Sequence, residues 1–475
     1  MMNQENKLAL VKELAAVNIS QNAEALQRLA EQNHAADLAE ALHELLLSEA
    51  VDQQGLQALL SLMPLTQSAR IFGYLPMSLQ LQMAETLDVA YVAKLLQAMS
   101  HDERVDFYNQ LPAALQLNVL PRMAQEEQRD IQKLAAYAEG TVGAVMTSDF
   151  AVLDAEQTAA QGIAHLRKVG RDTETIYQAY VLNEAGQLVG TVSLRDLIMA
   201  EPEDRVDQFV TTDPVFVRAE APQEEAARLI GKYDLMAVPV LNGGDRLAGI
   251  VTYDDAMDVV KAEGDEDFHR MGGVSDLVEP GHKGTVGQMA TSLKDATISL
   301  LYKKRVFWLV LLVFGNIFSG AGIAYFEETI EAYVALVFFL PLLVDSGGNA
   351  GSQSATLMVR ALATGEVVMK DWAGMLLREL AVAGLLGATM ALAVSTLGLW
   401  RGGMEIALVV ALTMQLVVVV GSLIGMSLPF LLSRLKFDPA TASAPLITSV
   451  ADAVGVVIYF GMATWILDIP AALAG

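Results

Sequence analysis

The sequence predicts a multidomain membrane protein with an all-α helical N-terminal domain, an α/β tandem pair of small domains, a connecting helix and a five-helix transmembrane domain. Three observations support this fold class. Apolar windows long enough to cross a bilayer are confined to the final third of the chain. Two internal repeats of different character divide the part before them. The charge is uneven, because the 475-residue chain has a net charge of −25 and only 11 acidic and 9 basic side chains follow residue 300.

The first domain, residues 1–138, has helical apolar spacing and an internal repeat. The stretch "LLSLMPLTQSARIFGYLP", which starts at Leu59, aligns with "LLQAMSHDERVDFYNQLP", which starts at Leu95, at an offset of 36 residues. A period of this length with helical patterning predicts a short solenoid of helix pairs. A helical bundle with a chance similarity is the alternative.

Residues 139–262 contain a second and stronger repeat with mixed strand and helix patterning. The stretch "VLNEAGQLVGTVSLRDL" from Val181 aligns without gaps with "VLNGGDRLAGIVTYDDA" from Val240, at an offset of 59 residues. Each copy predicts a β-hairpin followed by a helix. The tandem resembles a pair of CBS domains, whose hairpin and helix end in the pattern G-x-[IV]-[ST]-x-x-D.

A hydroxyl and a carboxylate recur at the end of this pattern, as Ser193 with Asp196 and as Thr252 with Asp255. A hydroxyl near a strand end can meet a phosphate, and a carboxylate three residues later can accept hydrogen bonds from ribose hydroxyls. The resemblance to CBS domains implies an adenine nucleotide such as ATP. The same residues would also cap the following helix, so both interpretations stay open at this point.

An acidic linker and a connecting helix are expected over residues 263–304. Seven acidic side chains fall within residues 254–267, with Lys261 the sole base among them. Such crowding raises the energy of the folded state by repulsion, and divalent cations would relieve it. Oxygen ligands without His or Cys spacing suit Mg²⁺ or Ca²⁺. A solvated acidic linker is the alternative. The stretch "TVGQMATSLKDATISLLYKK", residues 285–304, predicts a helix that leads into the first span.

The transmembrane domain is predicted over residues 305–475. Its five apolar windows are Val306–Tyr325, Ala332–Val359, Leu380–Trp400, Ile406–Ser433 and Pro439–Leu467. Basic residues gather in alternate connections between these windows, which predicts a cytoplasmic N-terminus and an external C-terminus in the inner, cytoplasmic membrane. The lipid bilayer is therefore an expected partner. Two charges, Asp345 and Asp452, fall inside the five windows.

The stretch "PLLVDSGGNAGSQ" from Pro341 is too polar to face lipid. Polar side chains and irregular backbone are tolerated at membrane depth where they line protein or a water-filled cavity, so this segment predicts a pathway. The expected pore-lining residues are Asp345, Gly347, Gly348, Asn349 and Gln353. The glycines predict a close approach of helices and an irregular backbone whose carbonyls can turn toward ions. Packing of small residues alone would explain the glycines but not the three polar side chains.

The last window sets Asp452 among small and hydroxylated residues, and Pro445 is expected to disturb the helix one to two turns before it. Mg²⁺ keeps most of its water and uses few direct carboxylates, so a sparse acid in a wet passage suits a hydrated ion. A buried, protonated aspartate is the alternative.

Taken together, these parts resemble the MgtE family of magnesium channels and transporters. The most specific stretches are "GGNAGSQSATLMVRALATGEV" from Gly347, "LPFLLSRLKFDPA" from Leu428 and "DAVGVVIYF" from Asp452. The resemblance implies a homodimeric pore that takes up Mg²⁺ and closes when cytoplasmic Mg²⁺ bridges the acidic regions. By matching position, Asp452 is the pore carboxylate. The implied cytoplasmic sensor acids are Asp102, Asp106, Asp234, Asp255, Asp258, Glu263, Glu266 and Asp267.

Two positions depart from the family pattern. The position of Asp345 is usually small and uncharged, and that of Ala444 often carries Gly or Asn. Selectivity for Mg²⁺ over Co²⁺, Ni²⁺ or Mn²⁺ therefore stays open, and a CBS-regulated permease for another divalent cation is an alternative.

Other functional classes are less well supported by the sequence. A membrane-tethered adenylate sensor without transport would not need Asp345 or Asp452. No HExxH motif is present and no histidine follows His282, so we expect no enzymatic activity. The acidic soluble half would repel a phosphate backbone, which argues against a nucleic-acid partner.

Overall fold

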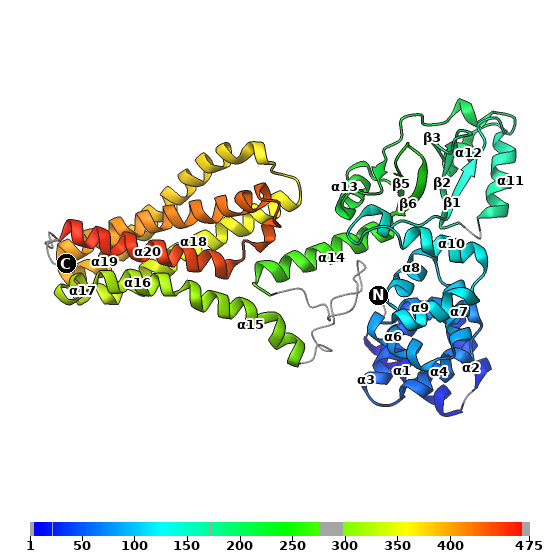
Figure 1. Ribbon diagram of the computed structural model, residues 1–475, viewed down its shortest axis with the longest axis horizontal. Helices are drawn as coiled ribbons and strands as arrows, with labels where there is room; N and C mark the ends of the chain where they lie inside the picture. Colours follow the sequence, from blue (N-terminus) through cyan, green and yellow to red (C-terminus); the bar gives the residue numbers. More distant parts are fainter. Residues whose placement is uncertain (1–3, 21, 171–172, 275–297, 468–475) are drawn as a thin grey trace. The chain divides into compact units, whose positions relative to one another are not determined.

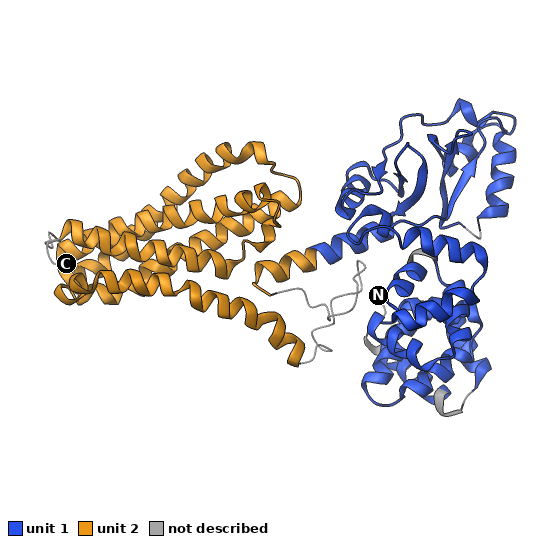
Figure 2. Ribbon diagram, in the orientation of Figure 1, with its two compact units in different colours: residues 1–263, 278–289 blue, residues 264–277, 290–475 orange. Residues whose placement is uncertain are grey.

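The computed structural model describes residues 4–20, 22–170, 173–274 and 298–467, and they form two compact units (Figure 2). Unit 1 holds residues 1–263 with 278–289, and unit 2 holds residues 264–277 with 290–475. Each unit is described by itself.

Unit 1 begins with ten α-helices joined by short turns (Figure 1). Proline ends one helix and starts the next at Pro64, Pro76 and Pro112, each of which is the N-cap of a helix. This placement is expected because proline lacks the N–H group that a helix interior needs. The helices are α1 (Gln4–Ser20), α2 (Ala23–Gln32), α3 (Ala35–Leu47), α4 (Gln53–Ser61), α5 (Leu65–Gly73), α6 (Met77–Thr86), α7 (Val89–Ala98), α8 (His101–Gln110), α9 (Ala113–Val119) and α10 (Gln125–Leu134).

The helical repeat with an offset of 36 residues is confirmed, but its unit is three helices and not the predicted pair. Helices α4, α5 and α6 recur as α7, α8 and α9. A side-chain hydrogen bond to a backbone carbonyl also recurs at equivalent positions of the two repeats. Ser68 Oγ donates to the carbonyl of Leu60 at 2.6 Å, and Arg104 Nε donates to that of Leu96 at 2.8 Å. Pro64 and Pro76 divide the first period into three short helices, and Ser100 and Pro112 occupy the equivalent N-cap positions in the second.

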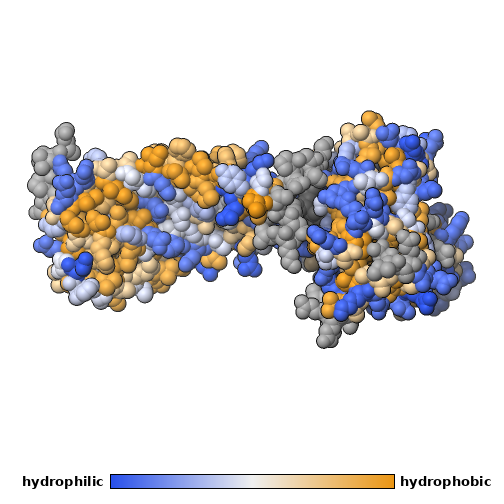
Figure 3. Space-filling view, turned by 90° about the horizontal axis from the view of Figure 1, so that it is seen from below, coloured by the Kyte–Doolittle hydropathy of each residue, from blue (hydrophilic) through white to orange (hydrophobic). Residues whose placement is uncertain are grey.

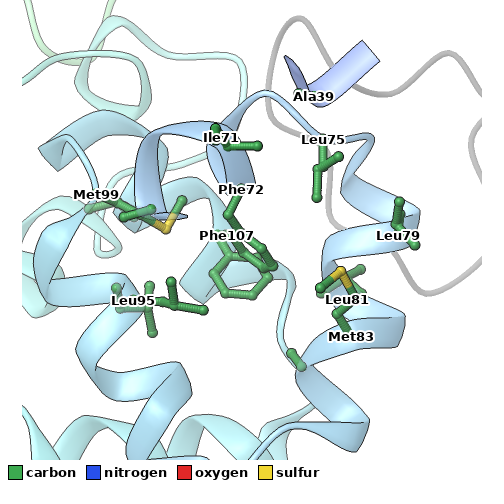
Figure 4. Packing of buried hydrophobic residues seen from close by; sticks show 14 of the residues in the cluster. Ala39, Ile71, Phe72, Leu75, Leu79, Leu81, Met83, Leu95, Met99 and Phe107 are labelled. Atoms are coloured by element: carbon green, nitrogen blue, oxygen red, sulfur yellow. The ribbon is translucent and has the colours of Figure 1, made fainter. Parts of the chain in front are cut away.

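The core of these helices is built around two aromatic rings from the repeat (Figure 4). Phe72 and Phe107 are fully buried and their ring centroids lie 5.1 Å apart in an edge-to-face arrangement. Leu75, Leu95 and Met99 pack around them. Burying such side chains stabilises the domain by about 1.5–3 kcal/mol each.

The CBS-like tandem forms two three-stranded sheets with the same topology. The first contains β1 (Phe150–Leu153), β2 (Thr175–Leu182) and β3 (Leu188–Ser193), and the second contains β4 (Val217–Arg218), β5 (Ala237–Leu241) and β6 (Leu247–Thr252). In each sheet the first pair of strands is parallel and the second is an antiparallel hairpin. Helices α11 (Ala159–Val169), α12 (Leu194–Met199) and α13 (Gln223–Tyr233) accompany them. The predicted hairpins are confirmed.

The two repeats exchange their entry segments. Thr147, ahead of β1, pairs with Ile250 of the second sheet, and Thr211, ahead of β4, pairs with Thr191 of the first. The glycine conserved between the repeats permits this approach, because a Cβ at Gly249 would lie 2.6 Å from the carbonyl oxygen of Thr147. The tandem is therefore one interlocked body.

Helix α14 (Tyr253–Met271) follows β6 without a break and carries the acidic segment that was expected to be a linker. The predicted connecting helix over 285–304 lies outside the described residues up to residue 297. Its last part, from Ile298, begins the next described helix.

Unit 2 is helical. After the end of α14 it contains α15 (Ile298–Gly315), α16 (Ile317–Tyr325), α17 (Glu327–Ala332), α18 (Ala335–Ala363), α19 (Trp372–Arg434) and α20 (Ala444–Ile466), with α18, α19 and α20 side by side (Figure 1). Within the described residues, three helical segments are long and apolar enough to cross a membrane: Ile298–Tyr325, Met369–Arg434 and Ala444–Ile466. Helix α18 is long enough to span, but its polar residues lower its hydropathy.

Helix α19 folds back on itself at Gly403, where φ is 79° and the backbone is not helical. The two arms pack closely, because a Cβ at Gly398 would lie 2.6 Å from Cα of Ala407. Farther along, Gln415 Nε2 donates to the carbonyl of Gly384 at 3.2 Å. Helix α19 therefore consists of two antiparallel arms, as the third and fourth predicted windows require.

Apolar side chains cover much of the surface of the unit 2 helices (Figure 3). Phe307, Phe318 and Leu392 are each more than 60% exposed. Such a surface is unsuited to water and suits a lipid bilayer.

Candidate functional site: the polar face of α18 and Asp452

A polar stripe runs along one face of α18. Asp345, Asn349, Ser352 and Thr356 follow one another at the spacing that places residues on one side of a helix. Asp345, Asn349 and Thr356 are exposed and Ser352 is half-buried. A span that faced lipid along this stripe would leave polar groups without partners, so the stripe marks a wet or protein-lined surface.

Gly347 and Gly351 of α18 face the second arm of α19, where they permit close approach. A Cβ at Gly351 would lie 2.7 Å from the carbonyl oxygen of Gly421, and Cβ atoms at Gly421 and Gly425 would collide with the backbones of Gly347 and Gly351. The helix itself is continuous from Ala335 to Ala363. The predicted close approach is confirmed, and the predicted irregular backbone is wrong because the glycines fit a regular helix.

Helix α20 brings Asp452 to the edge of the polar stripe. A Cβ at Gly348 would lie 3.1 Å from Cγ2 of Thr448 and 3.4 Å from Oδ1 of Asp452. Asp452 is half-buried. Gly348 thus leaves room beside the carboxylate, and the two residues predicted from different spans are brought together.

Pro445 starts α20 and does not disturb it. The helix begins at Ala444, so Pro445 occupies the first turn, where its missing N–H group costs nothing. The expected break before Asp452 is therefore wrong, and Asp452 lies about two turns into a regular helix.

Two further pore-lining candidates, Gln353 and Gly347, lie on different faces of α18. Gln353 is exposed one turn after Asn349, whereas Gly347 is buried against Val417 of α19. Gly347 therefore has a packing role in a single chain, and Gln353 extends the exposed polar surface.

Sequence analysis missed one acid, Glu379. Its Oε1 accepts a hydrogen bond from the hydroxyl of Ser354, which is buried on α18. The third apolar window starts at Leu380, eight residues after the start of α19 at Trp372, and therefore leaves out Glu379. Asp371, which accepts from the backbone N–H of Val368, is the start signal that could have extended the window.

The candidate sensor acids are spread over α14 and its surroundings. Thr252 Oγ1 donates to Asp255 at 2.5 Å, Gln223 Nε2 donates to Glu263 at 2.6 Å, and Glu266 pairs with Arg270. Asp258 and Asp267 lie on the same helix. Within the described residues no group of three His, Asp or Glu side chains is close enough to hold a metal ion. One chain therefore does not assemble the expected sensor site from this part of the protein.

The remaining sensor candidates lie elsewhere in unit 1. Asp106 is half-buried on α8, and Asp102 lies on the same helix with its side chain outside the described part. Asp234 is exposed and ends α13 in the left-handed conformation, with φ 52° and ψ 44°. A non-glycine residue in this conformation stores strain.

The hydroxyl and carboxylate of each pair in the tandem are hydrogen-bonded to each other. Ser193 Oγ accepts from the backbone N–H of Asp196 at 3.0 Å and donates to its carboxylate at 2.6 Å. Thr252 and Asp255 repeat the side-chain contact. Capping is thus realised at Ser193, and nucleotide binding stays a prediction.

Comparisons with known proteins agree with this arrangement. The family model described as "Divalent cation transporter", MgtE, matches residues 340–462, the MgtE intracellular N domain matches residues 33–140, and the CBS domain matches residues 142–203 and 206–262. A relative named "Magnesium transporter MgtE" from Thermus thermophilus is 38% identical over 341 residues, which cover 71% of this chain and 73% of the relative. The chain belongs to the MgtE family.

A second MgtE protein, from Bacillus subtilis, is 35% identical over 73% of this chain and 74% of its own length. Among solved structures, "Crystal structure of the soluble part of a magnesium transporter" is similar with a TM-score of 0.50 and 27% identity, covering 54% of this chain and 99% of that chain. The predicted MgtE membership and the tandem CBS domains are confirmed. This MgtE protein is therefore a multi-pass membrane transporter with an N-terminal MgtE domain, a CBS pair and a helical C-terminal region.

Proposed function

We propose that this MgtE protein is a Mg²⁺-selective channel or transporter that mediates magnesium uptake across the cytoplasmic membrane. The observation that carries the proposal is the position of Asp452 beside the polar stripe of α18. A carboxylate and a row of polar side chains are costly in helices that face only lipid. The names of the curated relatives support Mg²⁺ as the transported ion.

In this proposal Asp452 is the pore carboxylate and acts on a hydrated ion. A carboxylate without compensation inside a membrane domain costs several kcal/mol, and a passing cation supplies that compensation. Hydroxyl and amide groups of the stripe accept hydrogen bonds from the waters that Mg²⁺ retains. Gln353 and Asn349 lengthen this polar path.

Flux of Mg²⁺ into liposomes, followed with an enclosed dye, tests the proposal. Asp452→Asn keeps the size and removes the charge, so it should lower Mg²⁺ flux at least about tenfold, which corresponds to ~1.4 kcal/mol. Glu405→Gln is the matched control, because it removes one exposed acid at the turn of α19 and should conduct like the parent.

The same assay separates the competing proposals. Flux of Co²⁺ in preference to Mg²⁺ would favour a permease for another divalent cation, and absence of any ion flux would favour a membrane-tethered adenylate sensor. If Asp452→Asn conducts Mg²⁺ like the parent while Asp345→Asn does not, the carboxylate assignment is wrong.

We also propose that the pore closes when cytoplasmic Mg²⁺ binds the acidic residues of α14 and of the N-terminal and CBS domains. The support is the face of α14 that carries Asp255, Asp258, Glu263, Glu266 and Asp267 within five turns. Mg²⁺ that binds one state preferentially stabilises it by mass action. The N-terminus would be cytoplasmic and the C-terminus external, as the basic residues between the spans favour.

The functional unit is proposed to be a homodimer. Helix α14 leaves Tyr253, Met257, Val260 and Phe268 exposed along one side, at the spacing of a helical face. The polar stripe of α18 is likewise exposed on one chain. A second copy would cover both, since two-fold assemblies are the commonest oligomers. Purified protein should run as a dimer in mild detergent, and a monomer that retains flux would contradict the proposal.

ATP or a related adenine nucleotide is proposed as a ligand of the CBS pair, at Ser193 with Asp196 and at Thr252 with Asp255. The support is the recurrence of the hydroxyl and carboxylate at equivalent ends of both hairpins. The side chains already hydrogen-bond each other, so a nucleotide would have to replace those contacts. No nucleic acid and no catalytic reaction are part of the proposed function.

A further inference from the structure

Asp345 and Asn349 form a side-chain hydrogen bond on the polar stripe. Asn349 Nδ2 donates to Asp345 Oδ2 at 2.9 Å across one turn of α18. Neighbouring hydroxyls behave differently. Ser346 Oγ donates to the carbonyl of Leu342 at 2.6 Å, and Thr356 Oγ1 donates to that of Ser352 at 2.9 Å. The carboxamide of Asn349 is therefore held by a side chain, and its orientation depends on that side chain.

The orientation matters because a carboxamide has a donating end and an accepting end. A hydrated divalent cation presents the hydrogens of its water shell to the surroundings, so only acceptors stabilise it. A freely rotating asparagine would turn its donating NH₂ group toward the cation for part of the time. A carboxylate that accepts from Nδ2 leaves the amide oxygen for the ion.

The pair of Asp345 and Asn349 lies close to Asp452, so the orientation of the amide can affect an approaching ion. Gly348 lies between Asp345 and Asn349 in the chain. A Cβ at Gly348 would lie 3.4 Å from Oδ1 of Asp452, so the glycine leaves room beside this carboxylate. Asn349 is the next residue on the exposed side of the same turn. An ion that approaches Asp452 along the polar stripe would thus pass the amide of Asn349.

We propose that Asp345 is a positioning residue, which fixes the amide of Asn349 with its oxygen toward a passing hydrated divalent cation. This inference rests on the proposed function of the stripe as an ion path. It assigns Asp345 a role through Asn349 and not through its own charge. Two changes that both remove the charge, one keeping the hydrogen-bond acceptor and one removing it, therefore have different consequences.

A double-mutant cycle on the ratio of Mg²⁺ to Na⁺ flux tests the assignment. Asp345→Asn keeps a hydrogen-bond acceptor without the charge, so the ratio should stay within about twofold of the parent. Asp345→Ala removes the acceptor and should lower the ratio about fivefold, the factor expected for one hydrogen bond. Asn349→Ala should lower it by a similar factor, and adding Asp345→Ala to it should change nothing further.

Ser346→Ala is the control for a lost polar side chain on α18 and should match the parent. Asp345→Ser replaces the alanine variant if that variant fails to assemble, because serine is too short to span the turn to Asn349. Equal losses in Asp345→Asn and Asp345→Ala, or additive losses in the double variant, would overturn the inference and leave the ion path in place. A parent that passes no Mg²⁺ would instead remove the proposed function, and the inference with it.

Discussion

At the scale of single residues, Asp234 is held in a conformation that costs energy. It ends α13 with φ 52° and ψ 44°, where glycine is the residue usually found. Replacing it with glycine relieves the strain but adds chain entropy to the unfolded state. The net effect of Asp234→Gly should be a gain of about 0.5–1 kcal/mol in the free energy of unfolding in the absence of Mg²⁺. Thermal unfolding in EDTA measures it.

The same variant separates stability from ion sensing. If Asp234 is a sensor acid, the rise in melting temperature on adding Mg²⁺ should be smaller in Asp234→Gly than in the parent. Glu49→Gly is the matched control, because Glu49 has φ 56° in the N-terminal domain and is not a proposed sensor. It should gain similar stability with an unchanged response to Mg²⁺. A full response in Asp234→Gly would place the acid outside the sensor.

The sequence predicts which side chains of the spans are functional candidates, but it does not predict how they are arranged in space. Asp345, Asn349 and Asp452 stood out because ionisable and amide groups are costly in a lipid-facing helix. Their meeting across α18 and α20 depends on the room left at Gly348, which no local pattern reveals. Glu379 was not predicted because it lies one residue before the apolar window that starts at Leu380, although its partner Ser354 is buried.

At the scale of elements, the contact between α18 and the second arm of α19 depends on glycine. A Cβ at Gly425 would collide with the carbonyl oxygen of Gly351, which is backbone and cannot rotate away. Gly425→Ala should therefore destabilise the membrane domain by about 1–3 kcal/mol through forced separation of the helices. The loss should appear as a lower melting temperature in detergent, and α18 should still be helical.

Gly384→Ala is the matched control on the other arm of α19. Nothing lies within 4 Å of a Cβ built at Gly384. Alanine should there be neutral or stabilise the helix by up to about 1 kcal/mol, the difference in helix propensity. Equal melting temperatures for the two variants would mean that α18 and α19 do not pack through Gly351 and Gly425.

Elements were predicted best where the chain repeats itself. Both hairpins of the CBS pair fall at the expected offset of 59 residues, from Leu188–Ser193 to Leu247–Thr252. The 36-residue repeat was also found, but its division into three helices was not. Apolar periodicity continues across short turns, so it predicts helical content better than the number of helices. The prolines at positions 64, 76 and 112 mark the helix boundaries more reliably.

At the scale of the whole molecule, the proposed gating requires that an ion bound at acidic residues changes the state of the pore. Helix α14 carries both the acids and an exposed apolar side, and it runs without interruption from β6 to Met271. The sequence predicts a linker here, because seven acids in 14 residues raise the energy of the folded state by repulsion. Its helical form places the acids on a rigid support, on which a change at one end can be transmitted along the axis.

Neutralising three acids of α14 together tests this coupling. In Asp255→Asn/Asp258→Asn/Glu263→Gln the oxygens that accept from Thr252 and Gln223 remain, so the fold should be kept. The charge that attracts Mg²⁺ is lost. Flux should then resist cytoplasmic Mg²⁺ at about millimolar concentration, the range of weak oxygen-ligand sites, whereas the parent should be inhibited. Liposome flux with Mg²⁺ titrated on the cytoplasmic side measures the difference.

A change in overall charge must be excluded as the cause of such resistance. The control removes three exposed acids from the stretch between α12 and β4, as Glu201→Gln/Glu203→Gln/Asp213→Asn. It alters the net charge by the same amount and should keep the inhibition seen in the parent. If both triple variants resist Mg²⁺, the effect is one of general electrostatics. If the α14 variant is inhibited like the parent, the acids of α14 are a solvated surface and the pore is regulated elsewhere.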